Sequence, residues 1–414
     1  MEKIKLKVVS GKNIFWWNMM GSLCNAASSV FLLLAVSRIS GDAIAGIFSI
    51  AYAIAQLMLT IGLFEVRPYQ STDIQEKFVF KDYYTFRIIT CLLMIFISMV
   101  YTISKGYDIS KTIIVILMCV YKMIDALGDV FQGMFQQKNH LELSGKSLAF
   151  RVILSTIFFC VFLYFYDDLL LATVVAIIVS VFWFFFYDWR YAKKYFDKAE
   201  WSFMFEKQKS LFIECLPLFL GSFMMMYIIN APKYAIDTYL SSEFQAYYNV
   251  IFMPASVVNL FSLFLFRPML VTLTEFWNDF EYKKFITIII KLTLSICIVT
   301  AVVLLAVNFY GIPILSWVYG MNLTDYHNSL LLVIFGGGLS ALSTMLYYII
   351  TVMRQQYSLL IGYVISCLAS VFLANLFVQS YGILGGAITY VLAMVILSLF
   401  FLFIFLYYYR KRST

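Results

Sequence analysis

Long apolar stretches follow one another from end to end of the chain, separated by short polar segments. An α-helix of about 20 apolar residues is long enough to cross the hydrocarbon core of a bilayer. The apolar positions are continuous rather than alternating, which favours helices over the strands of a β-barrel. We therefore predict twelve transmembrane helices, at residues 13–37, 43–64, 87–104, 112–135, 148–166, 169–189, 211–236, 244–266, 285–307, 328–353, 357–378 and 383–409.

Composition supports an all-α polytopic membrane protein. The chain is 63% hydrophobic and only 13% charged, whereas a soluble domain carries about 25% charged residues. Its seven Cys show no metal or redox spacing and its two His are far apart, so we expect neither a metal site nor a cofactor. No G-x-x-x-x-G-K-[ST] phosphate loop is present, so the chain itself is not expected to hydrolyse ATP.

The distribution of basic residues predicts the orientation of the chain. Cytoplasmic loops of membrane proteins are enriched in Lys and Arg. If both termini lie in the cytoplasm, all 30 Lys and Arg fall on that side except Arg38, Lys105, Lys111, Lys122 and Lys233. The net charge of +7 is therefore a topogenic and membrane-surface signal. Because the cations are dispersed over many segments, they do not indicate a nucleic-acid partner.

A repeated motif indicates an internal duplication. Leu63-Phe64-x-x-Arg67-Pro68 recurs as Leu263-Phe264-x-x-Arg267-Pro268, and Met134-x-Gln136-Gln137 has an echo in Met353-x-Gln355-Gln356. The longest polar link divides the chain into two six-helix halves, residues 1–200 and 201–414. An even number of helices per half predicts parallel repeats, related by a pseudo-two-fold axis along the membrane normal.

The two Arg-Pro sites allow two interpretations. Arg67 and Arg267 each follow the predicted second helix of a half, at the cytoplasmic face. They are candidates for a gate at the cytoplasmic mouth of a transport pathway. The alternative is a topogenic arginine before a proline that ends the helix.

Two predicted helices carry polar residues in ordered sets. An ionisable residue inside a span costs about 2.5–3.5 kcal/mol on insertion scales, so it should face protein or water. Spacings of three and four residues place each set on one helix face. The sets are Lys122, Asp125 and Asp129 in the fourth helix, and Asn230, Lys233 and Asp237 in the seventh.

These sets also leave two possibilities open. They could line a hydrated cavity between the halves, where Lys122, Lys233 and Arg38 would contact an anionic substrate. They could instead form the intrahelical pairs Lys122–Asp125 and Lys233–Asp237, which would fix helix packing. In the tenth helix, the run Gly336–Gly338 is a candidate either for bending or for close packing.

A series of motifs resembles a known family. The series, in chain order, is Gly62-x-x-Glu65-x-Arg67-x-Tyr69, Asp125-x-x-Gly128-Asp129-x-x-x-Gly133-x-x-Gln136, Leu216-Pro217, Asn230-x-x-Lys233-Tyr234-x-Ile236-Asp237, Ala246-x-Tyr248-Asn249-x-Ile251-x-x-Pro254, Gly311-x-Pro313 and Tyr319-Gly320. The chain resembles the polysaccharide flippases, the Wzx-type exporters of O-antigen and capsule units in the MOP (multidrug/oligosaccharidyl-lipid/polysaccharide) superfamily. The resemblance implies a MATE-like fold of two bundles around a central cavity.

The same resemblance implies a function. It predicts a protein of the bacterial plasma (inner) membrane, with both termini cytoplasmic, that moves an undecaprenyl-diphosphate-linked oligosaccharide to the outer leaflet. Its partners would be that lipid-linked oligosaccharide, membrane lipids, and the polysaccharide polymerase and chain-length machinery. Two alternatives stay open: a cation-coupled multidrug extruder of the same superfamily, and an enzyme, namely a membrane-bound polysaccharide polymerase or acyltransferase. The short outer loops and isolated His residues disfavour the enzyme.

Overall fold

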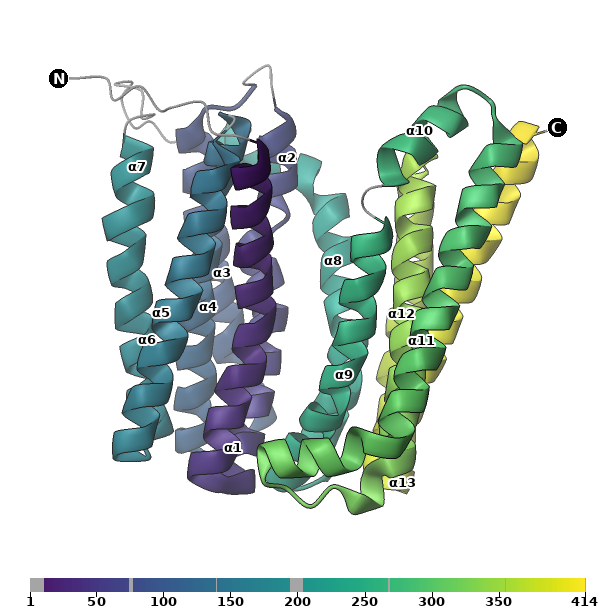
Figure 1. The fold of residues 1–414 in the computed structure, drawn as a ribbon. Helices are drawn as coiled ribbons and strands as arrows, with labels where there is room; N and C mark the ends of the chain where they lie inside the picture. Colours follow the sequence, from purple (N-terminus) through teal and green to yellow (C-terminus); the bar gives the residue numbers. More distant parts are fainter. Residues whose placement is uncertain are drawn as a thin grey trace. The chain divides into compact units, whose positions relative to one another are not determined.

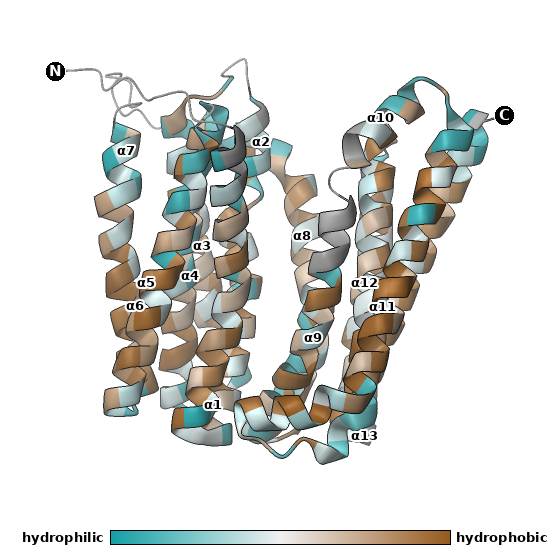
Figure 2. Ribbon diagram, in the orientation of Figure 1, coloured by the Kyte–Doolittle hydropathy of each residue, from teal (hydrophilic) through white to brown (hydrophobic). Residues whose placement is uncertain are grey.

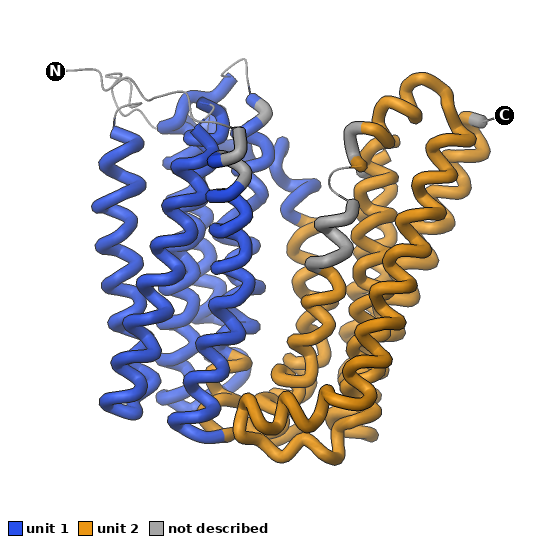
Figure 3. The backbone as a smooth tube through the Cα atoms, viewed as in Figure 1, with its two compact units in different colours: residues 1–41, 51–219 blue, residues 42–50, 220–414 orange. Residues whose placement is uncertain are grey.

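The computed structural model describes residues 11–73, 77–138, 140–193, 204–266, 269–353 and 355–413, and within them the chain is helical with no β-strand (Figure 1). The helices form two compact units, the first comprising residues 1–41 and 51–219 and the second residues 42–50 and 220–414 (Figure 3). The all-α polytopic architecture predicted from hydropathy is therefore confirmed.

The first unit is built around α4. Its elements are α1 (Gly11–Leu63, without residues 42–50), α2 (Val66–Thr72), α3 (Phe80–Lys105), α4 (Ile109–Gln137), α5 (Leu141–Tyr166), α6 (Leu169–Trp183), the π-helix η1 (Phe184–Trp189), α7 (Arg190–Ala192) and the first part of α8 (Phe205–Tyr239). Helix α4 packs against α2, α3, α5 and α6. Side chains at its centre are therefore enclosed by protein.

The second unit is built around α12. Its elements are the rest of α8, α9 (Ser242–Phe266), α10 (Leu270–Asn278), α11 (Tyr282–Tyr319), the 3₁₀ turn η4 (Thr324–Tyr326), α12 (His327–Val352) and α13 (Gln356–Ser413). Helix α12 packs against α9, α11 and α13. A Cβ at Gly336, Gly337 or Gly338 would crowd a side chain or backbone of α13, α9 or α11, respectively. The three glycines therefore permit close packing on three sides, rather than marking a bend.

Two long helices each contain two of the predicted spans. Helix α1 is kinked at Gly41, where φ is 80°, and α13 is kinked at Gly382, where φ is 59°. Glycine suits both positions because a side chain disfavours positive φ. Eight described helical segments are long and apolar enough to cross a membrane, and they do not include α4 or α9. The chain is a multi-pass membrane protein, and the number of twelve spans stays a prediction.

The apolar and polar residues are distributed as a bilayer requires. The middle of α6 and of α11 is mostly apolar, and hydrophilic residues gather at the C-terminal end of α13 (Figure 2). Helix α4 differs, since it carries Lys122, Asp125 and Asp129 within its length.

Candidate functional site

The charges of α4 are paired inside the first unit. Lys122 is 3% exposed and its Nζ donates to Asp125 Oδ2 at 3.0 Å. The same Nζ lies 5.0 Å from the centre of the Tyr52 ring. The intrahelical pair predicted as one alternative is therefore formed, and an aromatic ring adds a cation–π contact.

Asp125 also holds a cation from another helix. Arg151 of α5 is 1% exposed, and its Nη2 lies 3.2 Å from Asp125 Oδ1. On its other side, Nη1 of Arg151 lies 3.9 Å from Asp188 Oδ2 in η1, and Ser147 donates to Oδ1 of Asp188 at 2.5 Å. Ion pairs thus connect α4, α5 and η1 through a buried arginine.

Asp129 joins two further arginines. Its Oδ1 lies 3.1 Å from Nη1 of Arg67, and its Oδ2 lies 3.0 Å from Nη2 of Arg87 in α3. Arg87 is fully buried, and its Nη1 also donates to the backbone carbonyl of Gly62 at 2.5 Å. A buried guanidinium needs such partners, because an unpaired one costs several kcal/mol.

Arg67 reaches further along the same face of α4. It donates to Gln132 at 2.9 Å and to Gln136 at 3.4 Å, and also to Ser144 of α5 at 3.1 Å. Arg67 and Gln136 belong to the two repeated motifs of the first half. In this unit, the repeated motifs therefore bind each other.

Two glycines of α4 make room for this network. A Cβ at Gly128 would overlap the Arg151 guanidinium, and a Cβ at Gly133 would overlap the Gln70 side chain and crowd Arg67. The motif Asp125-x-x-Gly128-Asp129-x-x-x-Gly133 thus alternates acids that hold arginines with glycines that admit neighbouring polar side chains.

The backbone around Arg67 corrects the prediction that Arg-Pro ends a helix. Phe64 and Glu65 have φ values of 43° and 51°, so α1 ends there and α2 begins at Val66. Arg67 and Pro68 lie in the first turn of α2, where proline is tolerated because the N–H groups there have no intrahelical acceptor. The equivalent Arg267 lies outside the described residues.

Sequence reasoning missed the buried role of Arg87 and Arg151. The positive-inside pattern counts both as cytoplasmic cations, because the predicted third and fifth helices begin only at residues 87 and 148. The helices begin at Phe80 and Leu141, so both arginines lie inside them. Hydropathy does not detect these helix starts, because the first turn of each helix carries polar residues. Asp125 and Asp129 were a usable signal, since two acids inside a span need more cations than Lys122 alone.

The second unit presents a different arrangement around Lys233. This residue of α8 is 9% exposed, and its Nζ lies 4.9 Å from the centre of the Phe252 ring in α9. Among the residues that the structure describes, no carboxylate forms an ion pair with Lys233. In particular, the predicted pair with Asp237 is not formed.

The other predicted site residues differ in burial. Asn230 is 4% exposed, and its Nδ2 donates to the carbonyl of Met226 at 3.0 Å. Asp237 is half-buried near the end of α8, and Arg38 is exposed near the kink at Gly41. Of the set in α8, Asn230 and Lys233 therefore form the buried polar part.

The chain is similar to a protein of capsule synthesis. It is 24% identical over 408 residues to the capsular polysaccharide biosynthesis protein CapF of Staphylococcus aureus, an alignment that covers 96% of this chain and 98% of that protein. No family model matches the chain. That protein's name places it in capsule synthesis, one of the processes that the sequence resemblance implies.

Solved structures establish the fold class. An inward-facing multidrug resistance MATE-family transporter of the MOP superfamily matches with a TM-score of 0.70 at 14% identity, covering 98% of this chain and all 100% of that one. The lipid II flippase MurJ, in an inward closed conformation, matches with a TM-score of 0.69 at 18% identity, covering 95% of this chain and 90% of that one. The MATE-like fold is confirmed.

Proposed function

We propose that the chain is a flippase, not an enzyme, that moves an undecaprenyl-diphosphate-linked oligosaccharide repeat unit from the cytoplasmic to the outer leaflet by alternating access. The product would enter O-antigen, capsule or exopolysaccharide synthesis. The observation that carries the proposal is Lys233, a buried cation in an apolar bundle that no described carboxylate neutralises. A buried cation of this kind favours an anionic ligand.

The chemistry of the substrate matches this environment. A diphosphate is negatively charged, so it could serve as the anionic partner of Lys233. Charge-assisted hydrogen bonds to phosphate are strong. Asn230 lies one helical turn earlier, and its Nδ2 donates to the carbonyl of Met226 at 3.0 Å and to the sulfur of Met226 at 3.3 Å. Because a thioether is a weak acceptor, a sugar hydroxyl or a phosphate oxygen could replace the sulfur as the acceptor of that second N–H. The lipid tail is apolar, so it can stay in the bilayer while the polar part crosses.

The charged residues of α4 in the first unit have a different proposed role. Lys122 is buried and paired with Asp125, which also holds Arg151. We assign Asp125 and Asp129 primarily to holding helices together, and Lys122, which is buried and paired with Asp125, stays the cationic candidate for substrate contact from this unit. A cavity that brings Lys122 and Lys233 to one substrate stays a prediction, as do the roles of Arg38, Asp237, Arg67 and Arg267.

The proposal places the chain in the inner membrane of a bacterium with both termini in the cytoplasm. Its partners would be the lipid-linked oligosaccharide, membrane lipids, and the polymerase and chain-length machinery that use the exported unit. The positive-inside distribution supports this orientation.

Export in a strain that depends on this chain tests the proposal. We expect Lys233→Met to lower surface polysaccharide at least tenfold, and Lys233→Arg to retain most of it, because arginine keeps the charge. Protein abundance in the membrane, measured by immunoblot, is the control. Normal export in Lys233→Met would contradict the assigned role.

A deletion strain separates the alternatives. A flippase defect leaves lipid-linked repeat units on the cytoplasmic side, where an added periplasmic or external glycosidase cannot reach them. Accessible single units would instead indicate a missing polymerase. Unchanged polysaccharide together with increased accumulation of a cationic dye would indicate a drug extruder.

A further inference from the structure

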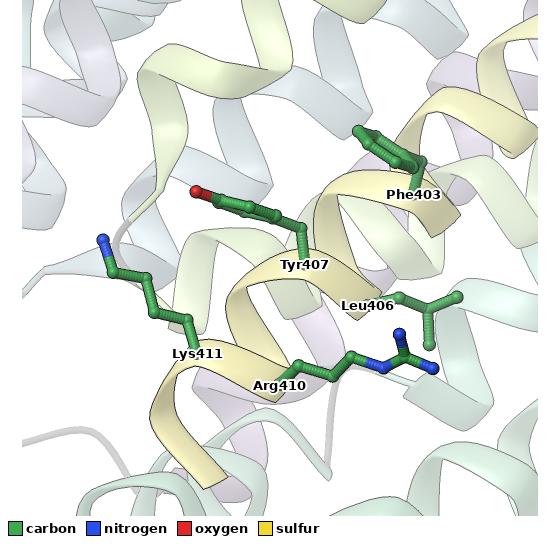
Figure 4. Close-up of a pocket in the computed structure, with 5 residues that line it drawn as sticks. All are labelled: Phe403, Leu406, Tyr407, Arg410 and Lys411. Carbon is green, nitrogen blue, oxygen red and sulfur yellow. The ribbon is translucent and has the colours of Figure 1, made fainter. Parts of the chain in front are cut away.

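Among the described cations of the second unit, only Lys233 of α8 is buried. The cations at the end of α13 differ, because they are exposed and line an open pocket together with Phe403, Leu406 and Tyr407 (Figure 4). There the Arg410 and Lys411 side chains extend to opposite sides of the helix. The surroundings of Lys233 therefore show how this unit accommodates a charge in its interior.

An aromatic ring lies beside the Lys233 ammonium. The Lys233 Nζ lies over the Phe252 ring of α9, at 4.9 Å from the ring centre. The face of an aromatic ring is electrostatically negative and attracts a cation, most strongly where water is excluded. Phe252 is only 9% exposed, so water weakens this contact little.

Two tyrosines hold the Phe252 ring in its place. The Tyr390 ring of α13 meets it edge-on, with 4.9 Å between the ring centres, and the ring centre of Tyr248 in α9 lies 6.0 Å away. Both tyrosines are buried, and the Tyr248 hydroxyl donates to the backbone carbonyl of Gly386 in α13 at 3.3 Å. The Phe252 ring is therefore fixed by contacts with its own helix and with α13.

Glycines admit these tyrosines. A Cβ at Gly336 of α12 would lie 2.5 Å from Cδ1 of Tyr390, and a Cβ at Gly386 would lie 3.1 Å from Cε2 of Tyr248. The first distance is too short for real atoms, so a side chain at Gly336 would displace the Tyr390 ring. A chain of contacts thus runs from Gly336 through Tyr390 and Phe252 to the ammonium.

We propose that Phe252 is a positioning residue, which holds the Lys233 ammonium in place for an anionic ligand without neutralising it. A lysine side chain is flexible, so ordering it only when the ligand binds would weaken binding. A carboxylate could also hold the ammonium, but the ligand would then have to displace that carboxylate. Lys122 of the first unit has such an acid, because it contacts the Tyr52 ring and is also paired with Asp125 at 3.0 Å. The role of Phe252 rests on the proposed function, in which the ligand is a diphosphate.

Binding of a polyprenyl diphosphate by the purified full chain in lipid nanodiscs tests this role. We expect Phe252→Leu to weaken binding about fivefold, because one long side chain must then be ordered at each binding event. Replacing Phe252 by 3,4,5-trifluorophenylalanine should weaken binding to a similar extent, because fluorine withdraws electrons from the ring face while the ring keeps nearly the same shape. Lys233→Met should bind more weakly still, and in that variant trifluorophenylalanine should have no further effect.

Phe401 of α13 is the matched control. It is fully buried and meets the Tyr363 ring edge-on, with 5.3 Å between the ring centres, but no described cation lies over its ring. Trifluorophenylalanine at position 401 should therefore leave binding unchanged. Thermal unfolding identifies variants that fail to fold, and the trifluorophenylalanine variant decides the role of Phe252 if Phe252→Leu is one of them.

Nuclear magnetic resonance tests the contact between Phe252 and Lys233 without a ligand. Protons above the face of an aromatic ring are shielded by its ring current and resonate upfield. In a chain whose lysines carry a carbon-13 label at Cε, the Lys233 signal, identified by its loss in Lys233→Arg, should be shifted upfield. Phe252→Leu should remove this shift, whereas trifluorophenylalanine at position 252 should retain most of it.

The two measurements separate the possible failures. A Lys233 signal without the upfield shift would overturn the contact, and unchanged binding in the variant with trifluorophenylalanine at position 252 would overturn the positioning role. A loss of binding in Phe252→Leu alone would assign Phe252 to packing. If the wild-type chain binds no polyprenyl diphosphate, or if Lys233→Met binds it normally, the proposed function fails, whereas an upfield shift would still support the contact between Phe252 and Lys233.

Discussion

Helices α4 and α12 are both central to their units, but they hold their neighbours by different means. Helix α4 joins α2, α3 and α5 through Asp125 and Asp129 and the cations paired with them. Helix α12 has no Asp, Glu, Lys or Arg in its described length and contacts its neighbours through Gly336–Gly338. Ion pairs fix direction and register, whereas close packing of small residues depends on shape alone.

The two buried lysines differ in the same way as the two units. Lys122 belongs to the paired network of the first unit, and Lys233 lies in a unit where no described acid neutralises it. A paired charge stabilises the fold, whereas an unpaired one remains available to a ligand. Of the two lysines, Lys233 is therefore the stronger candidate for the proposed contact with substrate.

The largest expected effect comes from removing the acid that holds two arginines. Asp129→Asn leaves the fully buried Arg87 without a carboxylate. Breaking such a buried pair costs about 3–5 kcal/mol of the free energy of unfolding. Thermal unfolding in detergent measures the loss, with the exposed Asp325→Asn as control. If Asp129→Asn and Asp325→Asn both unfold at the wild-type temperature, the ion pairs of α4 do not contribute to the stability of the fold.

The same substitution should destabilise the fold more at Lys122 than at Lys233. Lys122→Met removes a partner of Asp125 and should lower the free energy of unfolding by about 1–3 kcal/mol. Lys233→Met removes a buried charge with no described acidic partner, so a loss of less than about 1 kcal/mol is expected. The same unfolding assay compares them. An equal loss in the two variants would mean that Lys233 also stabilises the fold through an ion pair.

Glycines of the two units should also differ. Gly128→Ala forces the Arg151 guanidinium to move, at a cost of about 1–3 kcal/mol. Gly221→Ala in α8 places its Cβ 3.5 Å from the Tyr363 ring, which is an ordinary contact. Alanine is the better helix former by about 1 kcal/mol, so this control should unfold at or above the wild-type temperature. Similar destabilisation of both variants would refute the special role of Gly128.

The smallest effect concerns Asp73, in the polar segment between α2 and α3. Burial raises its pKa, but hydrogen bonds from the Phe78 N–H, the Tyr83 hydroxyl and the Lys77 N–H outweigh this and hold the pKa below its usual value. Such a carboxylate stabilises the fold above its unfolded pKa of about 3.9 and loses this contribution as the pH falls through the lower folded value.

Asp73→Asn should therefore unfold at a lower temperature than the wild type at pH 7, by an amount that corresponds to about 1 kcal/mol. The difference between the two proteins should begin to shrink as the pH falls below about 4 and should disappear once the pH is below the lowered pKa of Asp73 in the folded protein. A difference that persists unchanged in acid would show that the charge of Asp73 does not matter. The control is Asp325→Asn, which should follow the wild type at every pH.

Much of the architecture follows from local pattern. Apolar runs of helical length identified the segments that became α3, α5, α6, α11 and α12, because a bilayer requires each backbone to satisfy its own hydrogen bonds. The spacing of Lys122 and Asp125 correctly placed both on one face of α4. The pattern misses the starts of α3 and α5, because their first turns carry the polar residues Asp82 and Glu142.

The candidate site depended on contacts that no local pattern contains. Residue spacing predicts two intrahelical ion pairs equally well, Lys122–Asp125 and Lys233–Asp237. Only the first of these pairs is formed. Arg151, 26 positions from Asp125, and Arg87, 42 positions from Asp129, come near their acids only when α3, α4 and α5 pack together.

Hydropathy alone thus settled that the chain is helical and crosses the membrane repeatedly, because the cost of exposing polar backbone to hydrocarbon acts on every segment separately. Tertiary packing decided which buried charges are neutralised, and it left Lys233 without an acidic partner among the described residues. The reason is that an ion pair forms over a few ångströms in space, and residues far apart in the chain reach that distance only in the folded unit.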